Sequence, residues 1–238
     1  EGYRMIDTAA AYGNEEAVGA AIKSSDVPRS DILITTKVNF SSYENARASV
    51  EKSLGLLGTD YLDLVLLHWP FGNYYAAWRV LEEVKKIREI GVSNFDPDRL
   101  IDLSHFNSEV PVINQTETHL YCQRLREHSY ESALGVAHEA YAPLGQSRAN
   151  EMFDEPAVRA VMERAGKTPA QVLLRFLVDS DVIAIPKSAH TERIRENFGI
   201  FDFSLTEDEL SALRSLDKAS PMIGRAEDPE FAKVAVTW

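Results

Sequence analysis

The residues best suited to chemistry are an acid, a phenol, an amine and an imidazole that follow successive apolar runs. They are Asp7, Tyr12, Lys37 and His68. A phenol has an ordinary pKa near ~10, and a nearby ammonium lowers that pKa because it stabilises the phenolate. A carboxylate would keep the lysine charged and in place, and an imidazole could position a carbonyl oxygen. Together the four groups could protonate an oxyanion forming on a carbonyl, while a cofactor supplies the reducing equivalents.

Further polar residues follow later apolar runs. They are Ser93, Asn94, Gln115, Tyr141, Lys187 and Ser188. In a barrel of alternating strands and helices, active-site residues come from the carboxyl ends of the strands. We therefore expect these side chains to gather on the same face as the four groups above.

The elements that must position these residues alternate regularly along the chain. Short apolar runs, typical of strands covered on both faces of a parallel sheet, span residues 3–6, 32–36, 62–67, 89–92, 112–114, 136–141 and 182–185. Helical spacing of apolar residues predicts helices over 15–22, 43–57, 74–84, 97–103, 156–165, 169–178, 192–198 and 206–216. Asn14 is a candidate cap for the first helix, and Thr206 opens a capping box.

Alternation of this kind allows a (β/α)8 TIM barrel or a doubly wound open sheet. The chain has no G-x-G-x-x-G turn, which favours the barrel over the dinucleotide-binding open sheet. No linker or change in composition interrupts the 238 residues, so a single domain over 1–238 is predicted.

Composition narrows the classes of function. Apolar residues make up 45% of the chain and charged residues 26%, which indicates a globular protein. A formal net charge of −12 without a dense basic patch argues against nucleic-acid binding. No apolar run is long enough to span a membrane, and one cysteine, Cys122, fits a reducing, cytoplasmic environment and no multi-cysteine metal site. The histidines do not show metal-ligand spacing, so no metal is expected.

The motifs around these residues resemble those of the aldo-keto reductase family. They occupy residues 2–9, 11–15, 36–38, 67–70, 91–95, 114–115, 139–145 and 185–188, in the order that the family has them. Short loops resemble those of the bacterial diketogluconate and glyoxal-type reductases. The resemblance implies an NADPH-dependent oxidoreductase that reduces aldehydes or ketones to alcohols.

The same resemblance implies a role for each catalytic residue. Tyr12 would donate the proton, Lys37 would lower the pKa of Tyr12, and Asp7 would hold Lys37. His68 would orient the substrate, and Trp69 and Phe71 would line its pocket.

The implied NADPH-binding residues fall into three groups. Ser93, Asn94 and Gln115 would bind the carboxamide, and Tyr141 would stack on the nicotinamide. A loop of Leu144, Gly145 and Gln146 would approach the pyrophosphate. The adenosine phosphate and adenine would contact Lys187, Ser188, Arg193, Glu196 and Asn197, where the cations favour NADPH over NADH.

The chain departs from the family pattern at two places. The N-terminal hairpin and the first β/α unit of the barrel are missing before Glu1, and the connection at 81–88 is about three residues short for such a barrel. The tail, 217–238, is expected over the mouth of the active site. The expected partner is a small carbonyl compound, with no nucleic acid and no membrane, and the chain is expected to be a monomer.

Three other functions stay open on the sequence alone. A cofactor-binding protein that senses redox state could keep the same residues with little turnover. An N-terminally incomplete barrel could be inactive. A Schiff-base aldolase would need Lys37 in an apolar pocket, and the neighbouring Asp7 argues against it.

Overall fold

The computed structural model describes residues 1–237, so that Trp238 lies outside the described part of the chain. Seven strands occur in that part, and in the sheet they follow one another in chain order. They are β1 (Met5–Asp7), β2 (Leu33–Val38), β3 (Leu62–Leu67), β4 (Ile87–Ser93), β5 (Ile113–Glu117), β6 (Ala137–Tyr141) and β7 (Ile183–Ala184). Strand order and β/α alternation agree with the prediction from the sequence.

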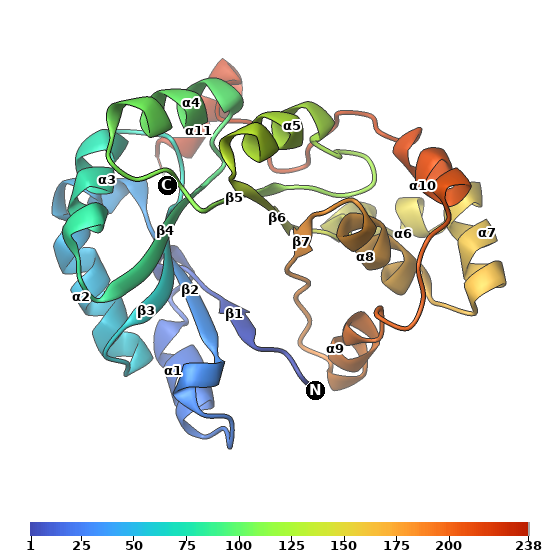
Figure 1. Cartoon of the computed structure of the whole chain (residues 1–238), viewed down its shortest axis with the longest axis horizontal. Coiled ribbons are helices and arrows are strands. Elements are labelled where there is room, and N and C mark those ends of the chain that lie inside the picture. Colours follow the sequence, from blue (N-terminus) through green and yellow to red (C-terminus); the bar gives the residue numbers. More distant parts are fainter. Residues whose placement is uncertain (238) are drawn as a thin grey trace. The chain divides into compact units, whose positions relative to one another are not determined.

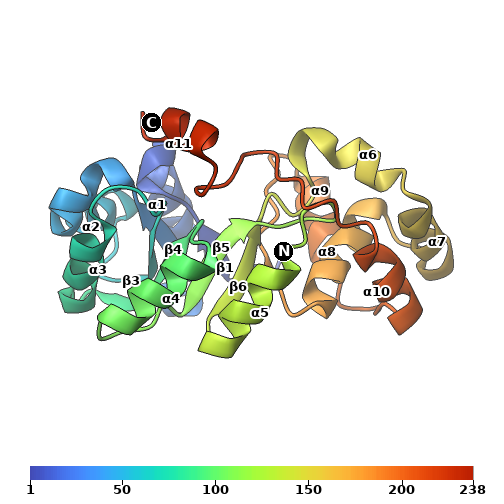
Figure 2. The ribbon, with the colours of Figure 1, turned by 90° about the horizontal axis from the view of Figure 1, so that it is seen from above.

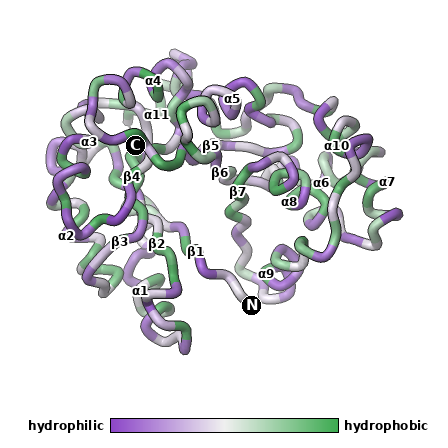
Figure 3. The backbone as a smooth tube through the Cα atoms, in the orientation of Figure 1, coloured by the Kyte–Doolittle hydropathy of each residue, from purple (hydrophilic) through white to green (hydrophobic). Residues whose placement is uncertain are grey.

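Helices connect successive strands. The α-helices are α1 (Glu15–Lys23), α2 (Ala46–Leu57), α3 (Tyr74–Glu83), α4 (Pro97–Phe106), α5 (Leu125–Leu134), α6 (Ala149–Phe153), α7 (Pro156–Ala165), α8 (Pro169–Asp179), α9 (Thr191–Phe198), α10 (Glu207–Arg214) and α11 (Pro229–Ala235). Short 3-10 helices are η1 (Ala10–Tyr12), η2 (Arg29–Asp31), η3 (Phe40–Asn45) and η4 (Gln146–Arg148). Hydrophilic and hydrophobic residues alternate along most helices (Figure 3), as in elements with one packed face.

The chain divides into two compact units, each with its own hydrophobic core. The N-terminal unit comprises residues 3–114, 133–136 and 225–237, and the C-terminal unit comprises 1–2, 115–132 and 137–224. One cluster of buried apolar side chains lies in the first of these and a second cluster in the other. Whether the chain behaves as one domain stays a prediction.

In the N-terminal unit, helices cover the outer side of strands β1 to β4 (Figure 1). Helix α2 packs through Ala46, Val50, Leu54 and Leu57, which are all buried, as the sequence predicts for the face of this helix. Strand β3 is buried along its whole length, and its bounds match the predicted run 62–67. A parallel strand covered on both faces needs this continuous apolar sequence.

A buried carboxylate joins three strands near their amino ends. Asp63 of β3 accepts hydrogen bonds from Arg29 at 2.7 Å, from Arg88 at 2.8 Å and from the backbone N–H of Ile34 at 3.0 Å. The ring of Tyr61 lies between the two guanidinium groups, at 4.1 and 4.0 Å from ring centre to carbon. Both arginines are thus held by the same carboxylate and the same ring, and this cluster stabilises the sheet.

In the C-terminal unit, helices α7, α8 and α10 pack side by side (Figures 1 and 2). Helix α8 begins with a capping box at Thr168, and α10 has the predicted capping box at Thr206. Helix α5 is not anticipated from the sequence, because its single buried residue is the acid Glu131. Glu131 forms a buried ion pair with His138 of β6, whose other ring nitrogen lies 2.8 Å from Thr118.

Three further differences from the sequence-based prediction have local causes. Residues 43–45 belong to the 3-10 helix η3, and α2 starts later than predicted. The short helices α6 and α11 lack enough turns for a periodic signal. Asn14 stands at the start of α1, but its side chain makes no capping hydrogen bond.

Two helical glycines predict opposite effects of the same substitution. A Cβ at Gly19 of α1 would lie 2.5 Å from the backbone oxygen of Leu57, whereas a Cβ at Gly55 would meet nothing within 4 Å. We expect Gly19→Ala to lower the free energy of unfolding by about 1–3 kcal/mol, because a backbone atom must move. Gly55→Ala should raise it by about 0.5–1 kcal/mol. Urea unfolding of both variants measures the two signs, and equal effects would contradict the close approach of α1 to α2.

Candidate active site

The centre of the site is a buried ion pair between neighbouring strands. Lys37 of β2 donates to both carboxylate oxygens of Asp7, at 2.6 and 2.7 Å, and to the carbonyl oxygen of Thr8 at 3.0 Å. Asp7 pairs with Thr35 in the β1–β2 register, and Lys37 lies two residues further on the same face of β2. Since the Lys37 side chain is 0% exposed, these three acceptors replace its hydration.

Tyr12 lies directly at this ion pair. Its ring centre is 5.3 Å from the Lys37 ammonium. Tyr12 is also 54% exposed, so solvent reaches its side chain. The tyrosine is the last residue of η1, in the loop between β1 and α1. An accessible phenol beside a buried cation fits a group that exchanges a proton with a bound molecule.

His68 meets Tyr12 edge to face. The two ring centres are 5.9 Å apart at an angle of 79°. Burial, with the nearby charge of Lys37, lowers the pKa of His68 from 6.5 to about 3. The imidazole is therefore neutral at physiological pH, and its Nδ1 atom is buried with no hydrogen-bond partner in the part of the chain that the structure describes.

Aromatic side chains continue from His68 along the same loop. Trp69 is buried and stacks with Phe71 at 5.8 Å between ring centres. Phe231 of α11 lies 5.3 Å from the Trp69 ring. The buried phenol of Tyr43 donates to the carbonyl oxygen of Trp69 at 2.7 Å and accepts from its N–H at 3.2 Å. The position of Trp69 is thus fixed through its backbone as well as its ring.

Ser93 and Asn94 close the end of β4 beside His68. Asn94 has a left-handed backbone with φ 63°, a conformation that asparagine tolerates better than most residues. Its amide donates to the carbonyl oxygen of His68 and to the hydroxyl of Ser93, both at 3.1 Å. The N-terminal unit therefore brings together eight predicted site residues: Asp7, Tyr12, Lys37, His68, Trp69, Phe71, Ser93 and Asn94.

The C-terminal unit holds the remaining predicted residues. Gln115 of β5 is buried and donates to Glu139 of β6 at 2.6 Å. Tyr141 ends β6 and is half-buried. In the loop that follows, Leu144 packs on the core of this unit and Gln146 is exposed. Gly145 has φ 71°, a left-handed backbone conformation that favours glycine.

Two cations flank the start of helix α9. Lys187 and Arg193 are exposed, and neither has an acidic partner among residues 1–237, whereas Arg195 on the same helix pairs with Glu1. Ser188 accepts from the N–H of His190 at 3.1 Å, which shapes the turn into the helix. Glu196 is half-buried, and Asn197 is buried. Unpaired cations at a helix start fit the phosphate groups of a dinucleotide cofactor.

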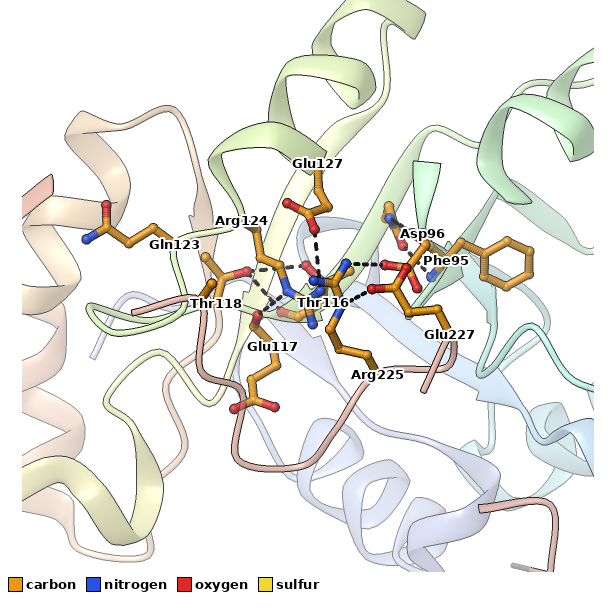
Figure 4. A network of polar contacts seen from close by, with 12 residues as sticks. Phe95, Asp96, Thr116, Glu117, Thr118, Gln123, Arg124, Glu127, Arg225 and Glu227 are labelled. Atoms are coloured by element: carbon orange, nitrogen blue, oxygen red, sulfur yellow. Dashed lines mark hydrogen bonds and ion pairs between the residues drawn. The ribbon is translucent and has the colours of Figure 1, made fainter. Parts of the chain in front are cut away.

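The tail of the chain is attached to each unit separately. In the C-terminal unit, the carboxylate of Glu117 accepts from the N–H groups of Met222 at 2.6 Å and Ile223 at 2.9 Å, and from His119 at 3.0 Å. Burial would raise the pKa of Glu117, but these hydrogen bonds lower it below its ordinary value. Figure 4 shows Glu117 beside Arg124, which donates to its backbone oxygen at 3.2 Å.

In the N-terminal unit, Arg225 pairs with Asp96 at 3.0 Å and with Glu227 at 2.8 Å (Figure 4). Placement of the tail over the mouth of the site stays a prediction, and its last residue lies outside the described part.

The sequence did not single out several residues that contact this site. Thr8, Tyr43 and Phe231 act through contacts between segments far apart in the chain, for which no local pattern exists. Glu117, in the C-terminal unit, makes a long-range contact of the same kind with Met222. Phe40 contacts Phe71 with ring centres 5.8 Å apart, and its place shortly after Lys37 is a signal that could have found it.

No group of three or more His, Cys, Asp or Glu side chains could hold a metal among residues 1–237. Over the same residues, no helix combines the length and the apolar character needed to cross a bilayer.

Comparison with known proteins identifies the family. The model of the aldo/keto reductase family matches residues 1–218. An aldo-keto reductase of Mycolicibacterium smegmatis is 42% identical over 224 residues, covering 91% of this chain and 80% of that protein. The methylglyoxal reductase DkgA of Escherichia coli is 40% identical over 223 residues, covering 91% of this chain and 81% of that protein.

Solved structures agree with this assignment. The crystal structure of MGS-M4, an aldo-keto reductase from a deep-sea metagenome of the Medee basin, has a TM-score of 0.92 and 37% identity, over 95% of this chain and 86% of that one. The Bombyx mori aldo-keto reductase AKR2E4, solved in complex with NADP, has a TM-score of 0.88 and 32% identity, over 95% and 82%. The predicted (β/α)8 fold class is confirmed, and the chain belongs to the aldo-keto reductase family of oxidoreductases.

Proposed function

We propose that this chain reduces small aldehydes or ketones with NADPH and that Tyr12 donates the proton. The observation that carries the proposal is the buried Lys37–Asp7 ion pair beside the exposed ring of Tyr12. A fixed positive charge at this distance can stabilise negative charge that develops on the phenol oxygen during proton transfer. The family and its methylglyoxal-reducing members support a carbonyl as the acceptor.

Each residue of the N-terminal unit then has a separate task. Tyr12 gives its phenol proton to the carbonyl oxygen as negative charge develops there. Lys37 stabilises the phenolate that remains, and Asp7 keeps Lys37 charged and in place. His68 orients the carbonyl as a neutral imidazole. When bound, NADPH supplies the hydride that reduces the carbonyl carbon.

The charged and polar side chains at the start of helix α9 support NADPH over NADH as the cofactor. Lys187 and Arg193 offer exposed positive charge to the 2′-phosphate, and Ser188 offers a hydroxyl at the same helix start. Glu196 and Asn197 would contact adenine. Gln115 with Ser93 and Asn94 would bind the carboxamide, Tyr141 would stack on the nicotinamide, and residues 144–146 would approach the pyrophosphate.

The substrate is proposed to lie against aromatic side chains. Trp69 and Phe71 present stacked rings next to His68. Such a surface suits short aldehydes with apolar or planar substituents. We therefore propose methylglyoxal and an aromatic aldehyde as the first two substrates for assay.

Loss of the phenol hydroxyl should remove most of the activity. We expect Tyr12→Phe to lower kcat for aldehyde reduction by about 10²–10⁴-fold, the usual contribution of a general acid. Oxidation of NADPH, followed by absorbance, measures the rate. Tyr130→Phe is the matched control, since Tyr130 is a comparably exposed tyrosine on helix α5. Tight NADPH binding by the unaltered protein without turnover would overturn the reductase proposal and favour a redox-sensing role.

Removing one cation at helix α9 should shift the cofactor preference. We expect Arg193→Ala to raise the Kd for NADPH about tenfold to a hundredfold, because a hydrogen bond to a charged group is lost. The Kd for NADH should change little. Quenching of intrinsic fluorescence measures both constants, with Arg195→Ala on the same helix as control, because Arg195 pairs with Glu1. Equal losses for both cofactors would contradict the assignment of Arg193 to the 2′-phosphate.

Burial of His68 should make the stability of the protein depend on pH. Its pKa is about 3 in the folded chain, against an ordinary value of 6.5. Between these values the unfolded chain binds the additional proton, so the free energy of unfolding falls as the pH drops from 6.5 towards 3. His68→Asn removes the group that takes up this proton. The slope of the free energy of unfolding against pH should therefore decrease by the contribution of one proton between pH 3 and 6.5. Urea unfolding at several pH values measures the slope, and an unchanged slope in the variant would contradict the neutral, buried imidazole.

A further inference from the structure

The proton donor of this site has a largely exposed side chain. Tyr12 is 54% exposed, and its ring centre lies 5.9 Å from that of His68 and 5.3 Å from the Lys37 ammonium. A phenol exposed to this extent keeps its place more firmly if the backbone beneath it is ordered. The loop of residues 8–14 therefore has to be held by other residues.

The start of this loop is firmly attached to strand β2. Thr8 is 0% exposed, and its N–H donates to the carbonyl oxygen of Thr35 at 2.9 Å. Its own carbonyl oxygen accepts from Lys37 at 3.0 Å. The chain then makes a tight turn in which the N–H of Tyr12 donates to Ala9 at 3.0 Å.

The end of the loop is held by Asn14, a residue that stands where it could instead cap helix α1. Asn14 stands at the N-cap position of α1, where an asparagine oxygen ordinarily accepts from a helix N–H. That capping bond is not made. Instead the side-chain oxygen of Asn14 accepts from the hydroxyl of Thr8 at 2.6 Å, across the mouth of the loop. Glu15, the next residue, accepts from Thr36 at 2.7 Å and secures the start of α1 beside Lys37.

We propose that Thr8 and Asn14 are positioning residues for Tyr12. Their hydrogen bond closes the loop at its two ends, so that the phenol stays at Lys37 and His68. The inference rests on the proposed function of Tyr12 as proton donor. Because the Asn14 side chain binds Thr8, it does not accept a hydrogen bond from the first N–H groups of helix α1. The first turn of α1 is therefore less stable than it would be with this cap.

Four variants test the proposal. Asn14→Ala removes the acceptor, and Thr8→Val removes the donor with little change of volume. Thr8→Ser keeps the donor and is the conservative rescue. Asn107→Ala is the matched control, because the Asn107 side chain is also hydrogen-bonded, to Arg79 and to the carbonyl oxygen of Leu103, but at the end of α4.

Two measurements are made on each variant. Amide hydrogen exchange, followed without substrate, reports whether Tyr12 and Gly13 stay ordered, since both N–H groups are hydrogen-bonded in the loop. Steady-state kinetics separates kcat from the KM for NADPH. We expect Asn14→Ala and Thr8→Val each to speed exchange at these two amides and to lower kcat by about 2- to 13-fold, the effect of one hydrogen bond. The KM for NADPH should stay within about twofold, as expected when binding contacts are intact.

Thr8→Ser and Asn107→Ala show whether an effect is specific to the Thr8–Asn14 hydrogen bond. Thr8→Ser should restore exchange and kcat to near their original values, and Asn107→Ala should change neither. Unchanged exchange at Tyr12 and Gly13 in both Asn14→Ala and Thr8→Val would overturn the proposal. Absence of turnover in the unaltered protein would instead overturn the proposed function, and the exchange measurement would still decide whether Thr8 and Asn14 hold the loop.

Discussion

The buried charge of Lys37 is the constraint on which the site depends. An ammonium without access to water is tolerated only where acceptors surround it, and here these are the Asp7 carboxylate and the Thr8 carbonyl. Strands β1 and β2 must therefore pair in one register, and the chain must turn immediately after Asp7. The same charge, together with burial, keeps His68 neutral. Removing Asp7 would leave the buried Lys37 ammonium without its carboxylate partner, so folding and chemistry both depend on this contact.

The two ends of the sheet in the N-terminal unit contrast in how they treat polar groups. At the amino ends of the strands, Asp63 and two arginines satisfy one another around Tyr61. Near the carboxyl ends, the ring of Tyr12 is left exposed beside the Lys37–Asp7 ion pair. Fully satisfied networks rigidify a fold, whereas an exposed polar side chain is available to a ligand. The structure thus separates the stabilising end from the reactive end.

Local signals explain what the sequence could predict. The sequence predicts strand β3 because five of its six residues are apolar, and α10 because its capping box is contiguous in the chain. The four candidate catalytic residues are recognisable because Asp7, Lys37 and His68 stand at the ends of apolar runs and Tyr12 lies in the loop after the first run. Helix α5 was missed because its buried contact is an ion pair of Glu131 with His138, which leaves no apolar stripe. Asn14 was assigned to a helix cap, and only the folded chain shows that Thr8 competes for its side chain. Contacts of this kind depend on where distant segments meet, which propensity and spacing do not record.

The attachment of the tail at Glu117 has a consequence for how such a protein can change. The carboxylate binds the main-chain N–H groups of Met222 and Ile223, which almost every amino acid possesses. Side chains at these positions can therefore be exchanged without detaching the segment, proline excepted, since it lacks the N–H. An anchor that does not depend on side-chain identity lets these two positions diversify by single substitutions while the attachment stays constant. Arg225 and Phe231 further along the tail are held through their side chains and lack this freedom.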